Sequence, residues 1–345
     1  MDIASLSATA NALVAPGKGI LAADESGGTI KKRFDSIGAD STEDNRRAYR
    51  EMLFTTKGAA DFISGVILFD ETIRQHASDG SRLVELLEAQ GVIPGIKVDL
   101  GAKPLAGADG ETVTEGLDGL RERLAEYHSL GARFAKWRAT YTISTGSSSD
   151  VLPSAYCIDV NAHALARYAA LCQEAGIVPI VEPEVLMDGD HTIERSFEVT
   201  TAVLDSLYEA LYLQRVRLDG TLLKPNMVLS GYSCPQQASV EEVAEATVRC
   251  FRATVPAAVP GIVFLSGGQT DEFATAHLNA MNQLANLPWQ LSFSYGRALQ
   301  APALKAWKGE PANVDAGKAA FFHRAKLNSA ARSGSYTADM EKAAG

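Results

Sequence analysis

Cysteine is scarce in this sequence, with four residues in 345, and none of them stands in a CxxC pair or another closely spaced metal motif. The four are Cys157, Cys172, Cys234 and Cys250. Disulfide-dependent folds are much richer in cysteine, so we expect reduced thiols. The histidines are also few and lack the spacing of metal ligands. They are His76, His128, His163, His191, His277 and His323. We therefore predict no bound metal.

The chain also lacks long apolar runs and a surplus of positive charge. No apolar stretch approaches the ~18 residues of a membrane span, and the first 18 residues lack the basic and apolar segments of a signal peptide. The formal net charge of -10 argues against broad nucleic-acid binding. The sequence therefore predicts a cytoplasmic protein without nucleic-acid or membrane partners, in which an anionic ligand would need a local basic pocket.

What the chain does contain is ample material for a core, since 46% of its residues are hydrophobic and 21% charged. Its length exceeds the roughly 100–200 residues of a typical domain, although an α/β barrel often occupies about 250 or more as one unit. One large domain and two small ones are both compatible with these bulk properties.

Eight apolar runs recur along the chain, bounded by Gly, Pro or Asp, and the segments between them show helical periodicity. The runs are Gly19–Glu25, Ile63–Asp70, Ile93–Asp99, Arg133–Thr140, Val178–Val185, Leu222–Val228, Gly261–Gly268 and Gln290–Arg297. The clearest helices are expected at Asp118–Leu130, Val160–Ala175, Thr192–Gln214, Val240–Val255 and Asp271–Asn286. Eight repeated units predict an α/β fold, a TIM (β/α)8 barrel, as a single domain over 1–345 with a short C-terminal extension from about 325.

Charged and small polar residues stand near the ends of these runs. They are Asp24, Asp70, Lys97, Lys136, Arg138, Glu182, Glu184, Lys224, Ser266 and Arg297. The C-terminal ends of barrel strands face the active site, so we expect these side chains to converge there. The alternative is that they form salt bridges inside the barrel with no catalytic role. Because buried lysines are costly unless compensated, several lysines and acids together favour chemistry.

An amine nucleophile fits this set of groups. Nearby cations and the exclusion of water lower the pKa of a lysine, and by position Lys97, Lys136 and Lys224 all qualify. Carboxylates at Asp24, Glu182 and Glu184 are available for the proton transfers that imine formation needs. The residues alone therefore indicate imine chemistry on an anionic carbonyl compound, without selecting one lysine.

Two glycine-containing turns are placed for phosphate binding. In such barrels the loops after strands seven and eight commonly present backbone N–H groups to a phosphate. Leu265–Gly268 allows close approach of the backbone, and Ser294–Arg297 adds a glycine and a guanidinium. Simple tight turns are the alternative for these glycines. Lys97 with Arg138 is a candidate for a second phosphate.

The strings GILAADES, FAKWR, PIVEPE, LLKPNM, FLSGGQ and SFSYGRALQ resemble the class I fructose-1,6-bisphosphate aldolases in order and spacing, over roughly residues 1 to 337. The resemblance implies a glycolytic and gluconeogenic lyase of the cytoplasm. Such an enzyme cleaves fructose 1,6-bisphosphate reversibly to dihydroxyacetone phosphate and glyceraldehyde 3-phosphate. It also implies a homotetramer whose partners are small sugar phosphates, with no metal or other cofactor.

By that resemblance, Lys224 is the Schiff-base lysine and Glu182 the acid and base for carbinolamine dehydration, supported by Glu184 and Lys136. Asp24 resembles the aspartate that assists removal of the C4 hydroxyl proton. The residues implied for the phosphate on C1 are Ser266, Gly267, Gly296 and Arg297, and Ser294 is expected among the substrate-binding residues. Those implied for the phosphate on C6 are Lys97 and Arg138, with Ser26 and Arg33 as weaker phosphate contacts.

One departure concerns the C-terminus. Many animal and plant members end in a tyrosine linked to enamine protonation, whereas this sequence ends in Lys342-Ala343-Ala344-Gly345. Tyr336 resembles an internal tyrosine that precedes that tail, not the tail residue itself. The resemblance therefore leaves open which group protonates the enamine.

Three other interpretations compete. A metal-dependent aldolase would need a ligand set, and only Asp188-Gly189-Asp190-His191 looks metal-like. We expect its acids to cap the following helix instead. A transaldolase or monophosphate-specific aldolase would also form an imine, although two phosphate sites favour a bisphosphate. A scaffold that has lost catalysis is opposed by the presence of every catalytic residue that the resemblance names.

Overall fold

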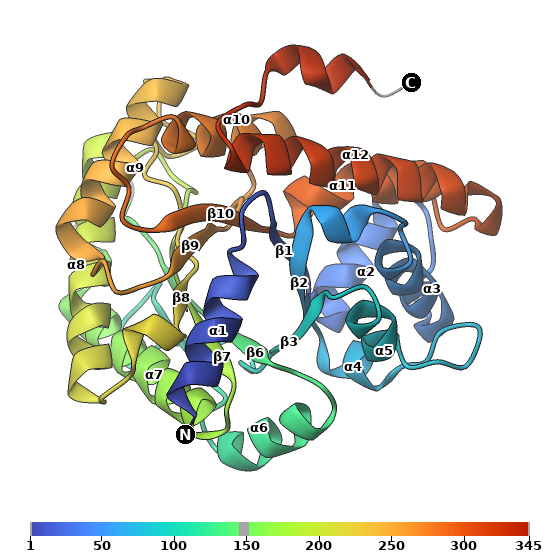
Figure 1. The fold of residues 1–345 in the computed structure, drawn as a ribbon. Helices are drawn as coiled ribbons and strands as arrows, with labels where there is room; N and C mark the ends of the chain where they lie inside the picture. The colour runs from blue at the N-terminus through green and yellow to red at the C-terminus, as the bar shows by residue number, and fades with distance from the viewer. Residues whose placement is uncertain (1, 145–151, 344–345) are drawn as a thin grey trace.

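The computed structural model describes residues 2–144 and 152–343. Its centre is a closed barrel of eight parallel strands in the order β1-β10-β9-β8-β7-β6-β3-β2 (Figure 1). The strands are β1 Gly19–Ala23, β2 Ile63–Leu68, β3 Ile93–Lys97, β6 Phe134–Tyr141, β7 Val178–Val185, β8 Leu222–Leu223, β9 Gly261–Phe264 and β10 Gln290–Tyr295. The predicted (β/α)8 barrel is confirmed, and each of the eight apolar runs contains one barrel strand.

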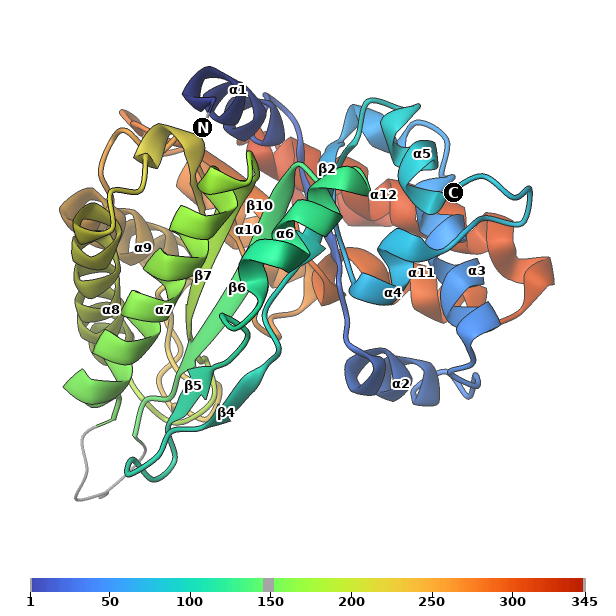
Figure 2. The same cartoon turned by 90° about the horizontal axis from the view of Figure 1, so that it is seen from below.

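The observed strands differ from the predicted ones in two places, a shorter β8 and an additional hairpin. Strand β8 spans only two residues of the seven expected, because Pro225 has no backbone N–H for the ladder. A small antiparallel pair, β4 (Ala102–Pro104) with β5 (Thr112–Thr114), was not predicted and stands after β3. Figure 2 shows this hairpin and α2 (Gly27–Asp35) at the end of the barrel opposite to α1 (Ile3–Leu13).

Helices surround the barrel, and all five predicted ones are confirmed. They are α6 Leu120–Ser129, α7 Ala155–Glu174, α8 Ile193–Leu213, α9 Val240–Thr254 and α10 Asp271–Asn282. The periodicity did not reveal the other helices. These are α1, α2, α3 Glu43–Phe54, α4 Asp70–Arg74, α5 Leu83–Glu88, α11 Arg297–Trp307 and α12 Val314–Arg332. Hydroxyl caps begin several of them. Ser239, for example, accepts from the Glu242 N–H and forms a capping box at the start of α9.

The end of the barrel next to α1 is filled with apolar side chains. Leu6, Leu13 and Val14 pack there with Phe134 and other inward-facing strand residues. The close packing requires small residues on the strands. A Cβ on Gly95 would stand 2.3 Å from the Phe134 ring, so only glycine leaves room for that ring. The filled end lies beneath the strand N-termini, which leaves the opposite end for polar groups.

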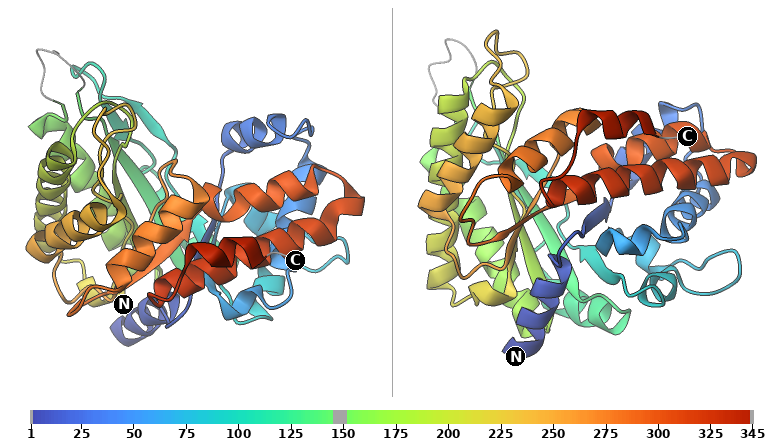
Figure 3. Two further views of the ribbon diagram at one scale, coloured as in Figure 1. Left: turned by 90° about the horizontal axis from the view of Figure 1, so that it is seen from above. Right: turned by 45° about the horizontal axis from the view of Figure 1, so that its top comes forward.

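The C-terminal helices α11 and α12 lie side by side on the outside of the barrel (Figure 3). A short 3-10 segment, η4 (Ala338–Ala343), follows them. Arg324 of α12 forms an ion pair with Glu341 at 2.6 Å, and Tyr336 donates a hydrogen bond to the same carboxylate at 2.9 Å. In the part of the chain that the structure describes, no helix combines the length and apolarity needed to traverse a bilayer.

Candidate active site

A cavity of about 1150 Å³ opens at the C-terminal ends of the barrel strands. Every catalytic or substrate-binding residue implied by the family resemblance lines it. These residues are Asp24, Ser26, Arg33, Lys97, Lys136, Arg138, Glu182, Glu184, Lys224, Ser266, Gly267, Ser294, Gly296 and Arg297. Seven lysine or arginine side chains and six carboxylates contribute to the lining. The net charge of the lining is therefore slightly positive, although the formal charge of the chain is -10. This is the local basic pocket that an anionic ligand would need.

Asp70 was wrongly expected among these converging groups. It begins α4, half of its side chain is exposed, and it pairs with Arg74 at 2.9 Å. The Tyr127 hydroxyl also donates to its carboxylate. The strand β2 ends two residues earlier, at Leu68, so the chain has already turned outward at Asp70. Its charge is accommodated on the surface of the protein.

Strand alternation explains why the remaining charges face inward together. Side chains two residues apart on a strand share a face, which groups Lys136 with Arg138 on β6 and Glu182 with Glu184 on β7. Register then sets neighbours across strands, since Arg138 pairs with Glu182 in the ladder. Lys224 follows the short β8, and its N–H still donates to the Val181 carbonyl at 2.8 Å. The lysine is thereby held at the strand end.

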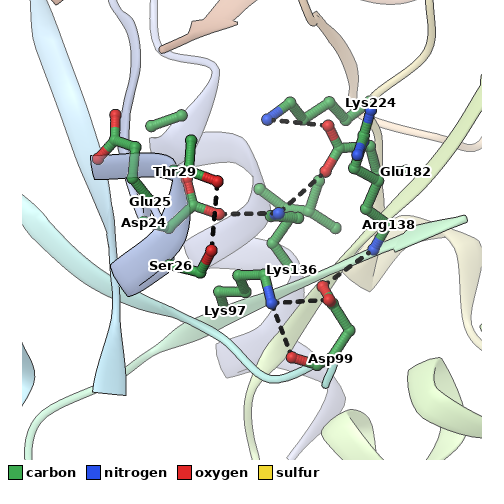
Figure 4. A network of polar contacts seen from close by, with 12 residues as sticks. Asp24, Glu25, Ser26, Thr29, Lys97, Asp99, Lys136, Arg138, Glu182 and Lys224 are labelled. Atoms are coloured by element: carbon green, nitrogen blue, oxygen red, sulfur yellow. Dashed lines mark hydrogen bonds and ion pairs between the residues drawn. The ribbon is translucent and has the colours of Figure 1, made fainter. Parts of the chain in front are cut away.

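The four innermost groups form a continuous chain of ion pairs, drawn in Figure 4. Lys136 Nζ lies 2.8 Å from Asp24 and 3.3 Å from Glu182, and Lys224 Nζ lies 3.2 Å from the other Glu182 oxygen. None of the four side chains is more than 12% exposed. The interior salt bridges of the alternative interpretation therefore exist, but they line a cavity that is open to ligands.

The electrostatics separate the lysines that the sequence could not. Burial alone would lower the pKa of Lys136, but the surrounding carboxylates, chiefly Asp24 and Glu182, outweigh burial and raise it well above its ordinary value. An amine held protonated in this way is a poor nucleophile. Lys97 is also engaged, with the side chain and the carbonyl of Asp99 each at 2.7 Å. Among the described residues, Lys224 contacts a single carboxylate, that of Glu182, which makes it the least restrained of the three.

The carboxylate of Asp24 is held in its charged form. Burial acts to raise its pKa, but the nearby lysine cations, first Lys136 and then Lys224, hold the pKa well below its usual range. Two cations thus share control of this acid. A change in the charge of either lysine would change how readily Asp24 accepts a proton.

Arg138 and Lys97 occupy one side of the cavity, each held by an acid. Arg138 donates to Glu184 through Nε, while nearly half of its side chain remains exposed. Asp99 is buried, holds Lys97 and accepts from the Arg138 backbone N–H at 3.3 Å. Sequence reasoning missed Asp99, although its position at the end of the apolar run, two residues after Lys97, was a usable signal. The acids direct both cations toward the cavity.

The two glycine turns lie on another side of the cavity. Gly267 and Gly268 have φ of +57° and +98°, a conformation that favours glycine. Gly296 precedes Arg297, the first residue of α11, so the free N–H groups of this helix N-terminus face the same region. The hydroxyl of Ser294 is buried and has no hydrogen-bond partner among the described residues. Donors without acceptors suit an anion.

Tyr232 lines the cavity, although no motif or periodicity in the sequence pointed to it. It lies on the loop after β8, and its hydroxyl donates to the Gly267 carbonyl at 3.0 Å and contacts Met187 Sδ at 3.2 Å. Burial raises its pKa to about 12, so the hydroxyl stays protonated at neutral pH. The side chain ties together the loops that follow β7, β8 and β9. It thereby fixes the glycine turn.

The helix α2 brings a further group of polar residues. Ser26 precedes this helix, and its hydroxyl lies 3.2 Å from that of Thr29. Arg33 also lines the cavity and is bound to Glu25, a buried acid that the sequence reasoning missed. Glu25 in turn contacts Arg50 of α3 at 2.5 Å. The pairing of Glu25 with Arg50 could not be predicted from the sequence, because the two residues stand 25 positions apart on different elements.

Tyr336 and the four cysteines lie outside the cavity lining. Tyr336 is buried against α10 and α12 on the outside of the barrel, where its hydroxyl donates to Glu341. The expected cap at Asp188–His191 was wrong, because the N-cap of α8 is Thr192, whose hydroxyl accepts from the Arg195 N–H. All four cysteines are buried free thiols, as expected. Residues 2–144 and 152–343 contain no group of three or more His, Cys, Asp or Glu arranged to hold a metal ion. Ala344 and Gly345 lie outside the described residues.

A family model described as fructose-bisphosphate aldolase class-I matches residues 5–345. A probable fructose-bisphosphate aldolase class 1 of Xanthomonas axonopodis pv. citri is 61% identical over 337 residues, which cover 97% of this chain and 99% of the relative. A fructose-bisphosphate aldolase of Dictyostelium discoideum is 56% identical over 335 residues, covering 97% and 93%.

A solved structure extends the comparison to three dimensions. It is the fructose-bisphosphate aldolase of Plasmodium falciparum, crystallised in complex with TRAP and a small-molecule inhibitor. The match has a TM-score of 0.95 and 50% sequence identity, and it covers 97% of this chain and 95% of the other. Sequence and fold therefore agree over nearly the entire length of both chains.

Proposed function

This chain belongs to the class I fructose-bisphosphate aldolase family and is a glycolytic aldolase, and we propose that it cleaves its substrate through an imine on Lys224. The observation that carries the assignment is the contact pattern of the barrel lysines. Lys136 is held by two acids and Lys97 by both the side chain and the carbonyl of Asp99. Within residues 2–144 and 152–343, Lys224 meets only Glu182, at 3.2 Å.

In the proposed mechanism, the Lys224 amine attacks the C2 carbonyl of fructose 1,6-bisphosphate. Glu182, 3.2 Å from Lys224, is placed to take the proton that the Lys224 ammonium loses before attack. It then gives this proton to the carbinolamine hydroxyl, which leaves as water and gives the protonated imine. Glu182 also contacts Lys136, so its charge after giving up the proton is stabilised by a cation. Glu184 holds Arg138 and contributes to the negative potential around the imine.

Cleavage of the C3–C4 bond then requires a base at the C4 hydroxyl, and we assign that role to Asp24. In the resting site Asp24 is a weak base, because Lys136 and Lys224 lower its pKa. When the C3–C4 bond breaks, its electron pair neutralises the positive imine nitrogen of Lys224. One of the two cations that weaken Asp24 is thereby lost, so the carboxylate becomes a stronger base as the proton arrives.

The products follow from the balance of atoms and electrons. Breaking the bond releases glyceraldehyde 3-phosphate and leaves an enamine on Lys224. Protonation at C3 and hydrolysis of the resulting imine release dihydroxyacetone phosphate and restore the amine. We assign the C1 phosphate to Ser266, Gly267, Ser294, Gly296 and Arg297. We assign the C6 phosphate to Lys97 and Arg138, with Ser26 and Arg33 as further phosphate contacts.

Borohydride reduction in the presence of dihydroxyacetone phosphate tests the assignment. A reduced imine can be located by peptide mass spectrometry, and the adduct is expected on Lys224. The matched control is Lys224→Met, in which trapping should disappear while the fold is retained by circular dichroism. An adduct on Lys97 or Lys136, or no adduct in the wild type, would overturn the proposal.

Comparison of two substrates tests the phosphate assignment. Fructose 1-phosphate lacks the C6 phosphate, so Lys97→Ala should raise the KM for fructose 1,6-bisphosphate and leave that for fructose 1-phosphate nearly unchanged. Ser294→Ala should instead affect both substrates. Equal effects of Lys97→Ala on the two KM values would contradict its placement at C6.

We also propose that the enzyme works in the cytoplasm as a homotetramer. A relative from Arabidopsis thaliana is named a cytosolic aldolase, and the family resemblance supports the tetramer. Exposed apolar side chains at the end of α8, Tyr212 at 81% and Leu213 at 69%, offer surface that an assembly would cover. Light scattering with size-exclusion chromatography measures the mass, and a monomer at micromolar concentration would refute the tetramer.

A further inference from the structure

Glu25 is the centre of a buried cluster next to the cavity. Its carboxylate accepts from Arg33, from Arg50 at 2.5 Å and from the Gln300 amide at 2.8 Å. The side chains of Glu25 and Arg50 are only 4% and 3% exposed. Glu25 and Arg33 both line the cavity, whereas Arg50 does not. Because Gln300 is neutral, the two arginines and the one carboxylate leave a single positive charge in the cluster.

Arg50 uses few of its hydrogen-bond donors within the described part of the chain. Arg50 makes one hydrogen bond, from Nη2 to Glu25, and its Nε and Nη1 have no partner within the described part of the chain. A buried guanidinium with unused donors is costly. Arg50 lies outside the cavity lining and does not reach a ligand there. What it supplies is a positive charge beside Glu25.

Arg33 connects this cluster to the phosphate region. Its Nη1 binds Glu25, while its Nη2 lies 3.4 Å from the point where a Cβ on Gly296 would stand. Gly296 is the residue before α11, and Arg297 is the first residue of that helix. Gln300 of the same helix donates to Glu25 and to the Ala22 carbonyl at 2.6 Å. The cluster thus holds α11 and Arg33 in one arrangement.

The charges define the consequence for substrate binding. With Glu25 alone, Arg33 would form a neutral pair, and an approaching phosphate would meet a carboxylate at the same guanidinium. With Arg50 on the far side, the carboxylate is already neutralised, and the net positive charge is presented through Arg33. The attraction is undiminished because the cluster is buried and poorly screened.

We propose that Arg50 is a positioning residue that keeps Arg33 available to the C1 phosphate of the substrate by neutralising Glu25. The inference rests on the proposed assignment of that phosphate to Gly296 and Arg297. The inference adds Arg50, which touches no substrate, to the residues on which phosphate binding depends. It also assigns Arg33 to the phosphate on C1. Arg50 acts through charge, so any cation with one donor at its position should serve.

The test compares Arg50→Met with Arg50→Lys. In Arg50→Met we expect the KM for fructose 1,6-bisphosphate, the KM for fructose 1-phosphate and the inhibition constant of inorganic phosphate to rise about tenfold, with kcat within about threefold of wild type. Arg50→Lys should restore all three. The double variant Glu25→Gln/Arg50→Met removes both charges and should also bring the three values to within about threefold of wild type.

Dependence on Arg33 is examined in an Arg33→Gln background. There, adding Arg50→Met should leave the phosphate inhibition constant unchanged, because the residue through which it acts is gone. The matched control is Arg324→Met, since Arg324 is an equally buried arginine paired with Glu341 away from the cavity. It should lower stability without changing any KM.

Several results would overturn the inference. The first is an inhibition constant of phosphate in Arg50→Met equal to that of the wild type. The second is an equal effect of Arg50→Met on this constant with and without Arg33. The third is a rise in the KM for fructose 1,6-bisphosphate without a rise in that for fructose 1-phosphate. If Arg50→Met does not fold, the double variant decides. Tenfold weaker phosphate inhibition there would refute the charge argument, and retention within threefold supports it. Borohydride trapping separates this inference from the proposed function, because loss of the Lys224 adduct in the wild type would defeat only the latter.

Discussion

Lys136 is predicted to be the residue on which the stability of the site depends most. Substitution Lys136→Met leaves Asp24 without a cation in direct contact, whereas Glu182 keeps Lys224 at 3.2 Å. Removing one partner of a buried ion pair typically costs about 3–5 kcal/mol. We expect a loss of that size in the free energy of unfolding at pH 7.5.

The comparison with Lys224→Met makes this prediction specific. In that variant both acids still contact Lys136, at 2.8 and 3.3 Å, so we expect a loss of about 1 kcal/mol or less. Lys136→Met/Asp24→Asn should recover most of the stability, because the unpaired charge is removed with its partner. Unfolding in urea, followed by circular dichroism, provides the four free energies.

The effect of pH has a defined sign. In the wild type the pKa of Asp24 is lowered, so its contribution is present above the unfolded pKa of about 4 and is lost as pH falls below it. Lys136→Met has a smaller contribution to lose, because the cation in direct contact with Asp24 is gone and only the more distant Lys224 and Lys97 still lower its pKa. The difference between the two proteins should therefore shrink below pH 4. Equal stabilities of Lys136→Met and the wild type at pH 7.5, or equal losses in the two lysine variants, would refute the reasoning.

Three further predictions concern the cavity and its surroundings. Tyr232→Phe removes the hydrogen bond to Gly267 and should raise the KM for both sugar phosphates about 2–10-fold, equivalent to roughly 0.5–1.5 kcal/mol. The control variant Tyr212→Phe should change neither KM. An unchanged KM in Tyr232→Phe would exclude a role of the hydroxyl in fixing the turn. Burial lowers the pKa of His277 to about 4, so the folded protein should lose up to about 3 kcal/mol as pH falls from 6.5 to 4, and His277→Gln should abolish this loss in acid-denaturation curves. Activity should survive EDTA treatment followed by desalting, and a loss restored by a divalent cation would revive the metal-dependent alternative.

The barrel could be predicted because its strands are buried on both faces and read as apolar runs. The prediction was least accurate at Leu222–Val228, where Lys224 is followed by Pro225 and the ladder ends. Helix α1 escaped notice because its small and hydroxyl residues show little periodicity, although Leu6 and Leu13 close the barrel. Local pattern alone does not reveal such tertiary burial.

The site was predictable to the extent that each functional residue ends a strand. Lys136 and Glu182 could be placed at one barrel end without knowing which atoms meet. The partners of the cations are different, since Glu25 lies in the turn after β1 and Arg50 on the distant helix α3. Pairing of this kind depends on how helices dock on the barrel, which neither spacing nor composition determines.

Closure of the barrel between β1 and β10 has a consequence for biosynthesis. Ile20 pairs with Ser294, so the first strand made acquires its second neighbour only when the last strand has emerged from the ribosome. At about 5–20 residues per second, Arg33 precedes Gly296 by roughly 15–50 s of translation. A nascent or prematurely terminated chain thus has no complete phosphate pocket, and metabolites cannot stabilise it by binding there. Ligand-assisted folding begins only after synthesis is nearly complete.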